Sequence, residues 1–284
     1  MIRPHPLAYL LGLEGLALLR AYAGDHDAAF VDARLAEVRA LLDLPWDEGA
    51  GLPAIGSAEA YDSWAGSYDD GENALVAIEE PIVRDILAGL PAGVALDAAC
   101  GTGRHSAYLA ELGHTVIGVD SSPRMLERAR EKVPAGSFLS GDLQALPLPD
   151  DHVDLVVCAL ALMHVRDLRA VLGELTRVLR PGGSLVVSDW RGLYGIPLPF
   201  VKAGGYVPSW NRPTSEYLSI ALALGLELRR CEEPLRPSPV VDPNAAPVDD
   251  PDGIWDLMTW APAAANAAYE GAPIALVLHF ELAR

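Results

Sequence analysis

The chain has 284 residues, which is enough for one large domain with an appended segment, and 51% of them are hydrophobic, so a sizeable core can form. Its 21 basic and 39 acidic residues give a formal net charge of −18, and no cluster of Lys and Arg interrupts this acidity. Because proteins bind the phosphates of DNA and RNA through basic residues, we expect no nucleic-acid substrate.

Cysteine usage and the N-terminal sequence favour a cytoplasmic protein. The three cysteines lack C-x-x-C spacing, which is typical of a reducing compartment and predicts no bound metal. The stretch from Leu7 to Leu19, followed by Ala21-Tyr22-Ala23, is similar to a signal peptide, but Glu14 interrupts it and its leucines fit one helical face. It is also too short to cross a bilayer, so we expect no association with a membrane.

The N-terminal part of the chain is predicted to be helical. Apolar residues at helical spacing predict helices over about 7–23 and 28–42. Residues 47–60 are rich in Gly, Ala and Pro, as linkers are. We therefore expect an N-terminal helical extension and linker over residues 1–58 and a main domain over residues 59–284. The expected role of the extension is to pack against the main domain or against a second subunit in a homodimer.

Strands and helices alternate along the main domain. Runs of Val, Leu and Ile predict strands at 93–97, 115–120, 137–141, 153–159, 184–189, 226–231 and 274–282. Helices are predicted at 79–90, 103–112, 122–133, 167–179 and 213–224. Arg180-Pro181-Gly182-Gly183 predicts a tight turn after a helix. This alternation indicates an α/β fold with a doubly wound, seven-stranded, mostly parallel sheet and an antiparallel last strand.

A glycine turn joins the first strand of this domain to a helix. The segment runs Asp97-Ala98-Ala99-Cys100-Gly101-Thr102-Gly103, and glycine lets a backbone bend sharply and approach a ligand closely. Doubly wound sheets bind nucleotides at this end of their strands. However, Ser106 stands where a dinucleotide site has Gly or Ala, and the Gly-Lys-Ser/Thr of a phosphate loop is absent. The Asp97 carboxylate would repel a pyrophosphate but attract an ammonium group, such as that of S-adenosylmethionine.

Five short motifs follow one another in order along the main domain. They are Asp97-x-x-x-Gly101-x-Gly103, Val119-Asp120-Ser121-Ser122, Gly141-Asp142-Leu143, Asp154 to Ala159, and Leu179 to Gly183. Together they resemble the class I S-adenosylmethionine-dependent methyltransferases, in particular the small-molecule group of the ubiquinone and menaquinone type. The resemblance is close over residues 61–190. It implies a Rossmann-like methyltransferase fold, S-adenosylmethionine as cofactor, and methyl transfer as the reaction.

The resemblance also implies a set of cofactor contacts. Asp120 ends a strand, where a carboxylate can accept two hydrogen bonds from a ribose diol, or can instead cap the next helix. Asp142 would accept from the adenine amino group and Leu143 would pack on adenine; the alternatives are a turn residue and a core residue. The predicted cofactor-binding residues are Tyr68, Asp97, Ala98, Gly101, Gly103, Asp120, Ser121, Asp142, Leu143 and Ala159.

The methyl acceptor is expected in an aromatic pocket. Segments 190–212 and 233–272 interrupt the regular alternation, and long irregular connections in a compact domain often carry function. The predicted substrate-binding residues are Tyr61, Trp64, Trp190, Tyr194, Tyr206 and Trp210. Such a lining suits a small, partly apolar acceptor, and we expect a natural-product intermediate methylated on O, N or C.

His164, just past the fourth strand, is the predicted catalytic residue. A neutral imidazole can accept a proton near pH 7, and Asp189 is a secondary candidate. A base is required only if the nucleophile loses a proton, and a purely structural histidine is the alternative. The competing hypothesis for the whole domain is a nicotinamide-dependent oxidoreductase on a related sheet, against which Ser106 argues. A third is a binding module without chemistry, against which the intact set of acidic and glycine positions argues.

Overall fold

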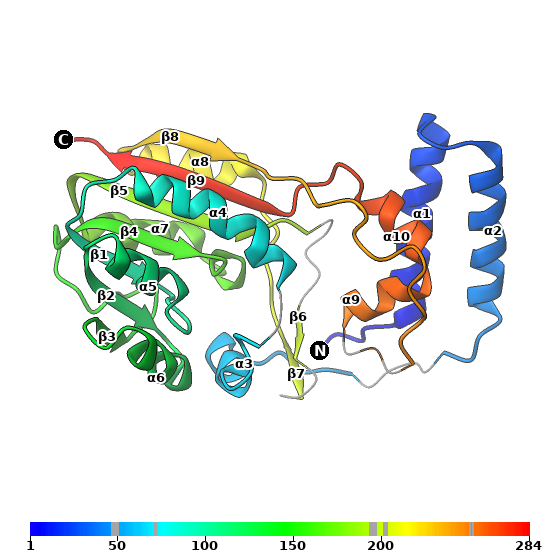
Figure 1. The fold of residues 1–284 in the computed structure, drawn as a ribbon, viewed down its shortest axis with the longest axis horizontal. Coiled ribbons are helices and arrows are strands. Elements are labelled where there is room, and N and C mark those ends of the chain that lie inside the picture. Colours follow the sequence, from blue (N-terminus) through cyan, green and yellow to red (C-terminus); the bar gives the residue numbers. More distant parts are fainter. Residues whose placement is uncertain (47–50, 71–72, 193–197, 201–203, 250, 252) are drawn as a thin grey trace. The chain divides into compact units, whose positions relative to one another are not determined.

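The computed structural model describes residues 1–46, 51–70, 73–192, 198–200, 204–249, 251 and 253–284 (Figure 1). The chain forms two compact units, and both are discontinuous in sequence. Unit 1 comprises Met1–Ala54, Pro199–Tyr206 and Leu235–Ala272. Unit 2 comprises Ile55–Leu198, Val207–Pro234 and Pro273–Arg284.

Unit 2 is built on a seven-stranded sheet with the strand order β3-β2-β1-β4-β5-β9-β8. These strands are β1 (Val94–Ala98), β2 (Thr115–Asp120), β3 (Ser137–Ser140), β4 (Val153–Ala159), β5 (Leu179–Trp190), β8 (Leu226–Glu232) and β9 (Ala275–Leu282). The first five run parallel, and β9 lies antiparallel between β5 and β8. The predicted α/β fold is confirmed. Because strand order reverses beside β1, a ligand-binding crevice is expected at the carboxyl ends of β1 and β4.

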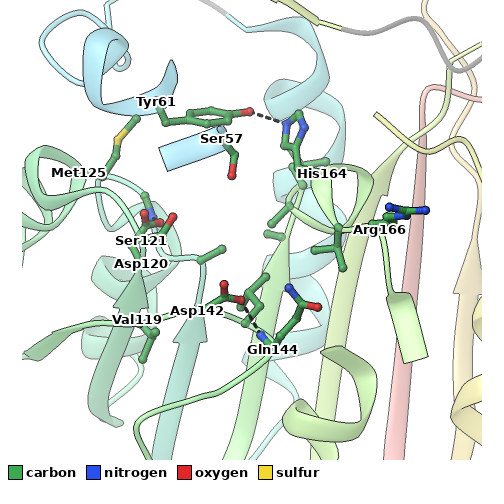
Figure 2. Close-up of a pocket in the computed structure, with 18 of the residues that line it drawn as sticks. Ser57, Tyr61, Val119, Asp120, Ser121, Met125, Asp142, Gln144, His164 and Arg166 are labelled. Carbon is green, nitrogen blue, oxygen red and sulfur yellow. Dashed lines mark hydrogen bonds between the residues drawn. The ribbon is translucent and has the colours of Figure 1, made fainter. Parts of the chain in front are cut away.

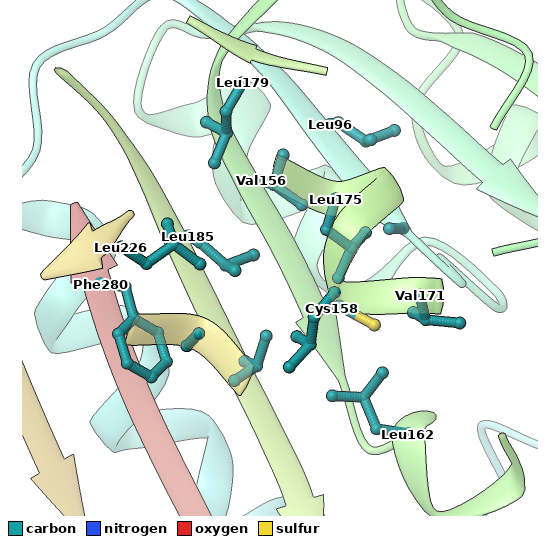
Figure 3. Packing of buried hydrophobic residues seen from close by; sticks show 14 of the residues in the cluster. Leu96, Val156, Cys158, Leu162, Val171, Leu175, Leu179, Leu185, Leu226 and Phe280 are labelled. Carbon is teal, nitrogen blue, oxygen red and sulfur yellow. The ribbon is translucent and has the colours of Figure 1, made fainter. Parts of the chain in front are cut away.

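Helices cover both faces of this sheet. They are α4 (Ala74–Ala88), α5 (Arg104–Glu111), α6 (Pro123–Lys132), α7 (Leu168–Arg177) and α8 (Thr214–Ala223). Unit 2 also contains α3 (Ser57–Trp64) and η1 (Leu162–His164). Side chains alternate along β4, so that Leu155 and Val157 share a core with α4 and α5, whereas Val156 and Cys158 share one with α7 and α8. Figure 3 shows the second core, with Leu175 of α7 close to Val156. Burial on both faces explains the continuous apolar runs of these strands.

Three predicted boundaries differ from the structure. The expected turn at 180–183 lies inside β5, where the register with β4 shifts and Gly182 has φ +80°. α4 begins at Ala74 rather than near 79, because the Asn73 side chain accepts hydrogen bonds from the first-turn amides of Leu75 and Val76. α3 begins at Ser57, inside the predicted linker 47–60, of which 47–50 are outside the described residues.

Unit 1 is helical. It contains α1 (Pro6–Ala23), α2 (Ala28–Leu42), α9 (Ile254–Leu257), η3 (Met258–Trp260) and α10 (Pro262–Tyr269). α1 packs against α2 and α10, and the hydroxyls of Tyr9 and Tyr269 are 3.2 Å apart. Residues 235–272, which we expected in the main domain, thus group with the N-terminal helices. α10 is rich in buried alanines, and α1 packs against it.

Two further features complete the fold. Strands β6 (Leu198–Phe200) and β7 (Gly205–Val207) form a separate two-stranded sheet. Among the helices in the described part of the chain, none combines the length and apolarity needed to cross a membrane.

Candidate active site

A cavity of about 340 Å³ opens at the carboxyl ends of the parallel strands of unit 2 (Figure 2). Several predicted site residues line it together, namely Tyr61, Tyr68, Gly101, Asp120, Ser121, Asp142, Leu143, Ala159, His164 and Trp210. Ser57, Met125, Gln144 and Arg166 also line it and were not predicted. The topology therefore gathers residues from segments more than 100 positions apart at one edge of the sheet.

Hydrogen bonds connect the glycine turn after β1 to the end of β2. The amide of Cys100 donates to the Val119 carbonyl at 3.0 Å, and that of Gly101 donates to Oδ2 of Asp120 at 2.8 Å. Gly101 has φ +53°, and an added Cβ there would meet nothing within 4 Å. The turn thus presents backbone to the cavity, as a site for a closely bound ligand requires.

Asp120 uses both carboxylate oxygens within the protein. Besides the Gly101 contact, Oδ1 accepts from the amide of Ser122 at 2.8 Å. The cap of α6 is Ser122, whose hydroxyl accepts from the amide of Met125 at 3.2 Å, so Asp120 is not the cap. Burial raises the pKa of Asp120, against the lowering effect of these backbone hydrogen bonds. Each carboxylate oxygen has a second acceptor site, which leaves capacity for the two hydroxyls of a ribose.

Asp142 combines the two roles that the sequence left open. Its Oδ1 accepts from the amide of Gln144 at 2.8 Å, which forms a turn, and the residue also lines the cavity. Leu143 likewise lines the cavity while it packs against the core beneath.

Asp97, Ala98 and Gly103 do not line the cavity that the structure describes. The Asp97 side chain is buried and accepts a hydrogen bond from Oγ of Ser106 at 2.7 Å. Burial raises its pKa, opposed by the nearby His105 and by the Ser106 hydroxyl. Ser106, which breaks the dinucleotide pattern, therefore serves as the partner of Asp97. A contact between Asp97 and an ammonium group stays a prediction.

A buried glutamate that the sequence analysis missed also interacts with His105. Glu79 of α4 is fully buried, with Arg104 at 3.0 Å from Oε2 and the Ser188 hydroxyl at 2.6 Å from Oε1. Burial acts to raise its pKa, but His105, whose Nε2 is 3.5 Å from Oε1, and the charge of Arg104 lower it to about 2. The sequence feature that could have revealed Glu79 is its position between apolar residues at helical spacing along α4.

The segment around α3 is held at the cavity by two aspartates. Oδ1 of Asp62 accepts from the Ser122 hydroxyl at 2.8 Å and from the Arg124 amide at 3.0 Å. Asp69 accepts from Thr102 Oγ1 at 2.9 Å and pairs with Lys132 at 3.0 Å. These contacts fix the segment that carries Tyr61 and Tyr68, both of which line the cavity.

The predicted Trp64 lies next to the cavity without lining it. Its ring contacts Tyr68 edge-on at 4.8 Å between centroids and Tyr61 at 6.1 Å, and the residue is 37% exposed. Trp64 thus supports the two tyrosines from outside. Its role in binding substrate stays a prediction.

Tyr61 and His164 form a hydrogen-bonded pair in the cavity wall (Figure 2). The Tyr61 hydroxyl is 3.0 Å from Nε2 of His164, and Nδ1 is 3.3 Å from the Pro208 carbonyl oxygen. Because a carbonyl only accepts, this network assigns the ring proton to Nδ1, so Nε2 accepts the Tyr61 proton. Burial lowers the pKa of His164 and raises that of Tyr61. The pair is therefore neutral, with the basic nitrogen directed at the phenol.

Asp189 holds the η1 turn that carries His164. Its Oδ1 accepts from the Met163 amide at 3.0 Å, and the Met163 carbonyl accepts from the Trp210 amide at 2.8 Å. Arg212 donates to the Leu162 carbonyl at 3.1 Å. Burial raises the pKa of Asp189 to about 6, opposed by its hydrogen bond from Tyr217. Asp189 does not line the described cavity, so it fits a positioning role.

The remaining predicted acceptor contacts lie elsewhere or outside the described residues. Trp190 does not line the described cavity, and its amide donates to Asp189 at 2.9 Å. Tyr206 belongs to unit 1, where its amide donates to the Pro53 carbonyl at 3.0 Å. Tyr194 falls outside the described residues. Contacts of these three with a substrate stay predictions.

The Gly101→Ala variant should fold with a modest loss of stability. The left-handed backbone at φ +53° costs a residue with a Cβ about 1–2 kcal/mol, and no neighbouring atom obstructs the methyl group. Gly103→Ala is the comparison, because its Cβ would lie 3.1 Å from Cα of Ala129. Chemical unfolding should therefore show the larger loss for Gly103→Ala. Equal losses would contradict the open space assigned to Gly101.

Known proteins match the part of the chain that forms this cavity. A sequence profile described as "Methyltransferase domain" matches residues 96–187. The malonyl-[acyl-carrier protein] O-methyltransferase of Serratia marcescens is 38% identical over 134 residues, which are 46% of this chain and 51% of that protein. The demethylmenaquinone methyltransferase of Renibacterium salmoninarum is 33% identical over 156 residues, 54% of this chain and 62% of that protein. The chain thus spans about half the length of the curated relatives it matches.

Solved structures share the fold. An S-adenosylmethionine-dependent methyltransferase from Mesorhizobium loti, 22% identical, aligns with a TM-score of 0.54 over 73% of this chain and 99% of that one. The residues of the matched profile run from β1 to β5 and include Asp120, Asp142 and His164. Residues 96–187 thus match a methyltransferase domain, and the fold of unit 2 is shared with S-adenosylmethionine-dependent methyltransferases.

Proposed function

We propose that this protein transfers the methyl group of S-adenosylmethionine to a small molecule. The observation that carries the proposal is the convergence of Asp120, Asp142 and the Gly101 turn on one cavity, whose wall also contains the Tyr61–His164 pair. When bound, S-adenosylmethionine supplies a methyl carbon already activated by the neighbouring sulfonium.

The described residues fit that cofactor. Asp120 retains acceptor capacity for ribose hydroxyls, and the open space beside Gly101 admits a ligand against the backbone. Asp142 and Leu143 offer an acceptor and an apolar surface for adenine. Tyr68 offers an aromatic ring that can attract a sulfonium through a cation–π contact.

Within this proposal, Tyr61 and His164 accept a proton from the methyl acceptor. The acceptor's O–H or N–H bond breaks, its proton passes to the Tyr61 oxygen, and the phenol proton passes to Nε2 of His164. The imidazolium that forms keeps its Nδ1 hydrogen bond to Pro208. If the nucleophile carries no proton, the same phenol orients it by hydrogen bonding.

The identity of the acceptor does not transfer from the relatives. By their names, the Serratia protein methylates a malonyl-acyl-carrier protein and the Renibacterium protein a demethylmenaquinone. The aromatic wall formed by Tyr61, Tyr68 and Trp210 supports a small, partly apolar acceptor. A natural-product intermediate, a homodimer and a cytoplasmic location remain predictions.

Calorimetry tests the proposal without knowledge of the acceptor. The full chain is titrated with S-adenosylhomocysteine and, in parallel, with NADH. We expect saturable binding of S-adenosylhomocysteine and none of NADH, because Asp120 and Asp142 in the cavity are placed for a ribose and an adenine, whereas Ser106 breaks the dinucleotide pattern of the glycine turn. Binding of NADH alone would contradict the proposal and restore the oxidoreductase alternative.

A further inference from the structure

We propose that the methyl acceptor carries an anionic group, a carboxylate or a phosphate, which Arg166 and Arg169 bind in a groove beside the cavity. The inference rests on the proposed function, because it assigns a chemical property to the acceptor of the same site. It concerns residues that no motif of the sequence singled out.

The groove shares lining residues with the cavity. It has a volume of about 930 Å³ and lies between the start of α7 and the first turns of α8. Gln144 and Arg166 line both spaces, so one ligand can extend from the cavity into the groove. Figure 2 shows Arg166 across the cavity from Asp120, with its guanidinium directed away from Asp120 and Asp142. The charged end of this side chain is therefore not directed at the two carboxylates of the cavity.

The guanidinium groups of Arg166 and Arg169 are available to bind an anion. Both are exposed, and neither forms an ion pair with any residue in the described ranges. This sets them apart from the many arginines of the chain that have carboxylate partners, such as those at positions 20, 34, 84, 104, 128, 177, 180, 191, 212, 229 and 230. In a chain of net charge −18, two unpaired guanidiniums that line one groove mark a local site for an anion.

The acidic residues of the groove do not cancel this charge. Glu216 is paired with the buried Arg212 at 3.3 Å. Asp167 caps α7 by accepting from the Ala170 amide at 3.0 Å, and it is the one lining carboxylate in the described groove without a cationic partner. Two guanidiniums therefore face one such carboxylate, which leaves the groove locally positive.

The donors in the groove suit an oxyanion. A guanidinium presents paired N–H groups that match the oxygens of a carboxylate or a phosphate. Ser215 and Ser219, one turn apart on α8, line the same groove and add two hydroxyl donors. An anion bound there would anchor the acceptor at a distance from its reacting atom, and such anchoring orients a nucleophile.

NMR titration of the full chain saturated with S-adenosylhomocysteine tests the inference. Inorganic phosphate and acetate are added separately at constant ionic strength, and the arginine Nε–Hε signals are followed. We expect saturable shifts of the Arg166 and Arg169 signals with at least one probe. The R166Q/R169Q double variant should weaken that binding at least about tenfold, since hydrogen bonds between charged groups are lost. R39Q is the matched control, because Arg39 is exposed on α2 and has no ion pair in the described chain.

The outcomes separate this inference from the proposed function. Saturation by phosphate alone or by acetate alone supports the inference and identifies the anionic group. Shifts that never saturate would overturn the anion site, and so would anion binding that is weakened as much in R39Q as in the double variant. In either case, binding of S-adenosylhomocysteine would still support the proposed function. Saturable anion binding by a protein that does not bind S-adenosylhomocysteine would keep the groove as an anion site and remove the proposed function.

Discussion

The Asp120→Ala variant is expected to bind S-adenosylhomocysteine about 10- to 150-fold more weakly than the unaltered chain. Asp120 lines the cavity at the end of β2, and hydrogen bonds to an ionised carboxylate contribute about 1.5–3 kcal/mol to binding. The variant also frees the amides of Gly101 and Ser122, which loosens the turn that faces the ligand. Calorimetry with S-adenosylhomocysteine measures the effect directly.

Asp154→Ala is the matched control for this variant. Asp154 also accepts from a backbone amide, that of Val94 at 2.8 Å, and it pairs with Arg180 at 2.7 Å. However, it lies at the start of β4, at the opposite end of the strands from the cavity. Its loss should leave affinity for S-adenosylhomocysteine unchanged. An unchanged affinity in Asp120→Ala as well would remove Asp120 from the cofactor site.

Glu79→Ala is expected to lower the free energy of unfolding by about 3 kcal/mol. Removing one partner of a buried charge pair costs about 3–5 kcal/mol, because the other charge loses its compensation. The lower end applies because Arg104 is partly exposed and has Glu80 at 3.8 Å as a second partner. The Ser188 hydroxyl also loses its acceptor. Urea unfolding at neutral pH measures the loss, and a change within experimental error would contradict the network.

The same residue should make stability depend on pH in the acid range. The pKa of Glu79 is about 2 in the folded protein against 4.5 ordinarily, so the folded state holds this proton less tightly than the unfolded state. Its contribution is fully present above pH 4.5 and is lost as the pH falls toward 2. The unaltered chain should therefore lose stability more steeply than Glu79→Gln over this range. Parallel curves would show that Glu79 does not titrate in this way.

Local sequence patterns were sufficient to predict the strands and the residues at their ends. Strand β4 was predicted with the observed bounds because burial on both faces makes it uniformly apolar. Asp120 and Asp142 were predicted from motifs at the ends of β2 and β3, and the parallel sheet brings both to one edge, where they line the cavity. The prediction of a turn before β5 was wrong, because a pair of glycines can form an irregularity within a strand as well as a turn.

Contacts between distant residues could not be predicted from those patterns. Tyr61 and His164 were each singled out, but they are 103 positions apart and no pattern links them. Glu79 was read as one residue of a helix, since its partners Arg104 and Ser188 come from other elements. The groove at Arg166 was missed for the same reason, because it forms only where α7 and α8 meet.

The make-up of unit 1 constrains how this protein can be shortened. Its third segment, Leu235–Ala272, is inserted between β8 and β9, and the last helix of that insert packs on α1. A chain that began at residue 55 would keep α10 but lose α1, which packs against it. The alanines of α10 and the Tyr269 side chain, which is 2% exposed in the intact chain, would then be exposed. Such an apolar surface promotes aggregation. The N-terminal helices and the β8–β9 insert are therefore interdependent, and a trimmed catalytic core would have to lose both at once.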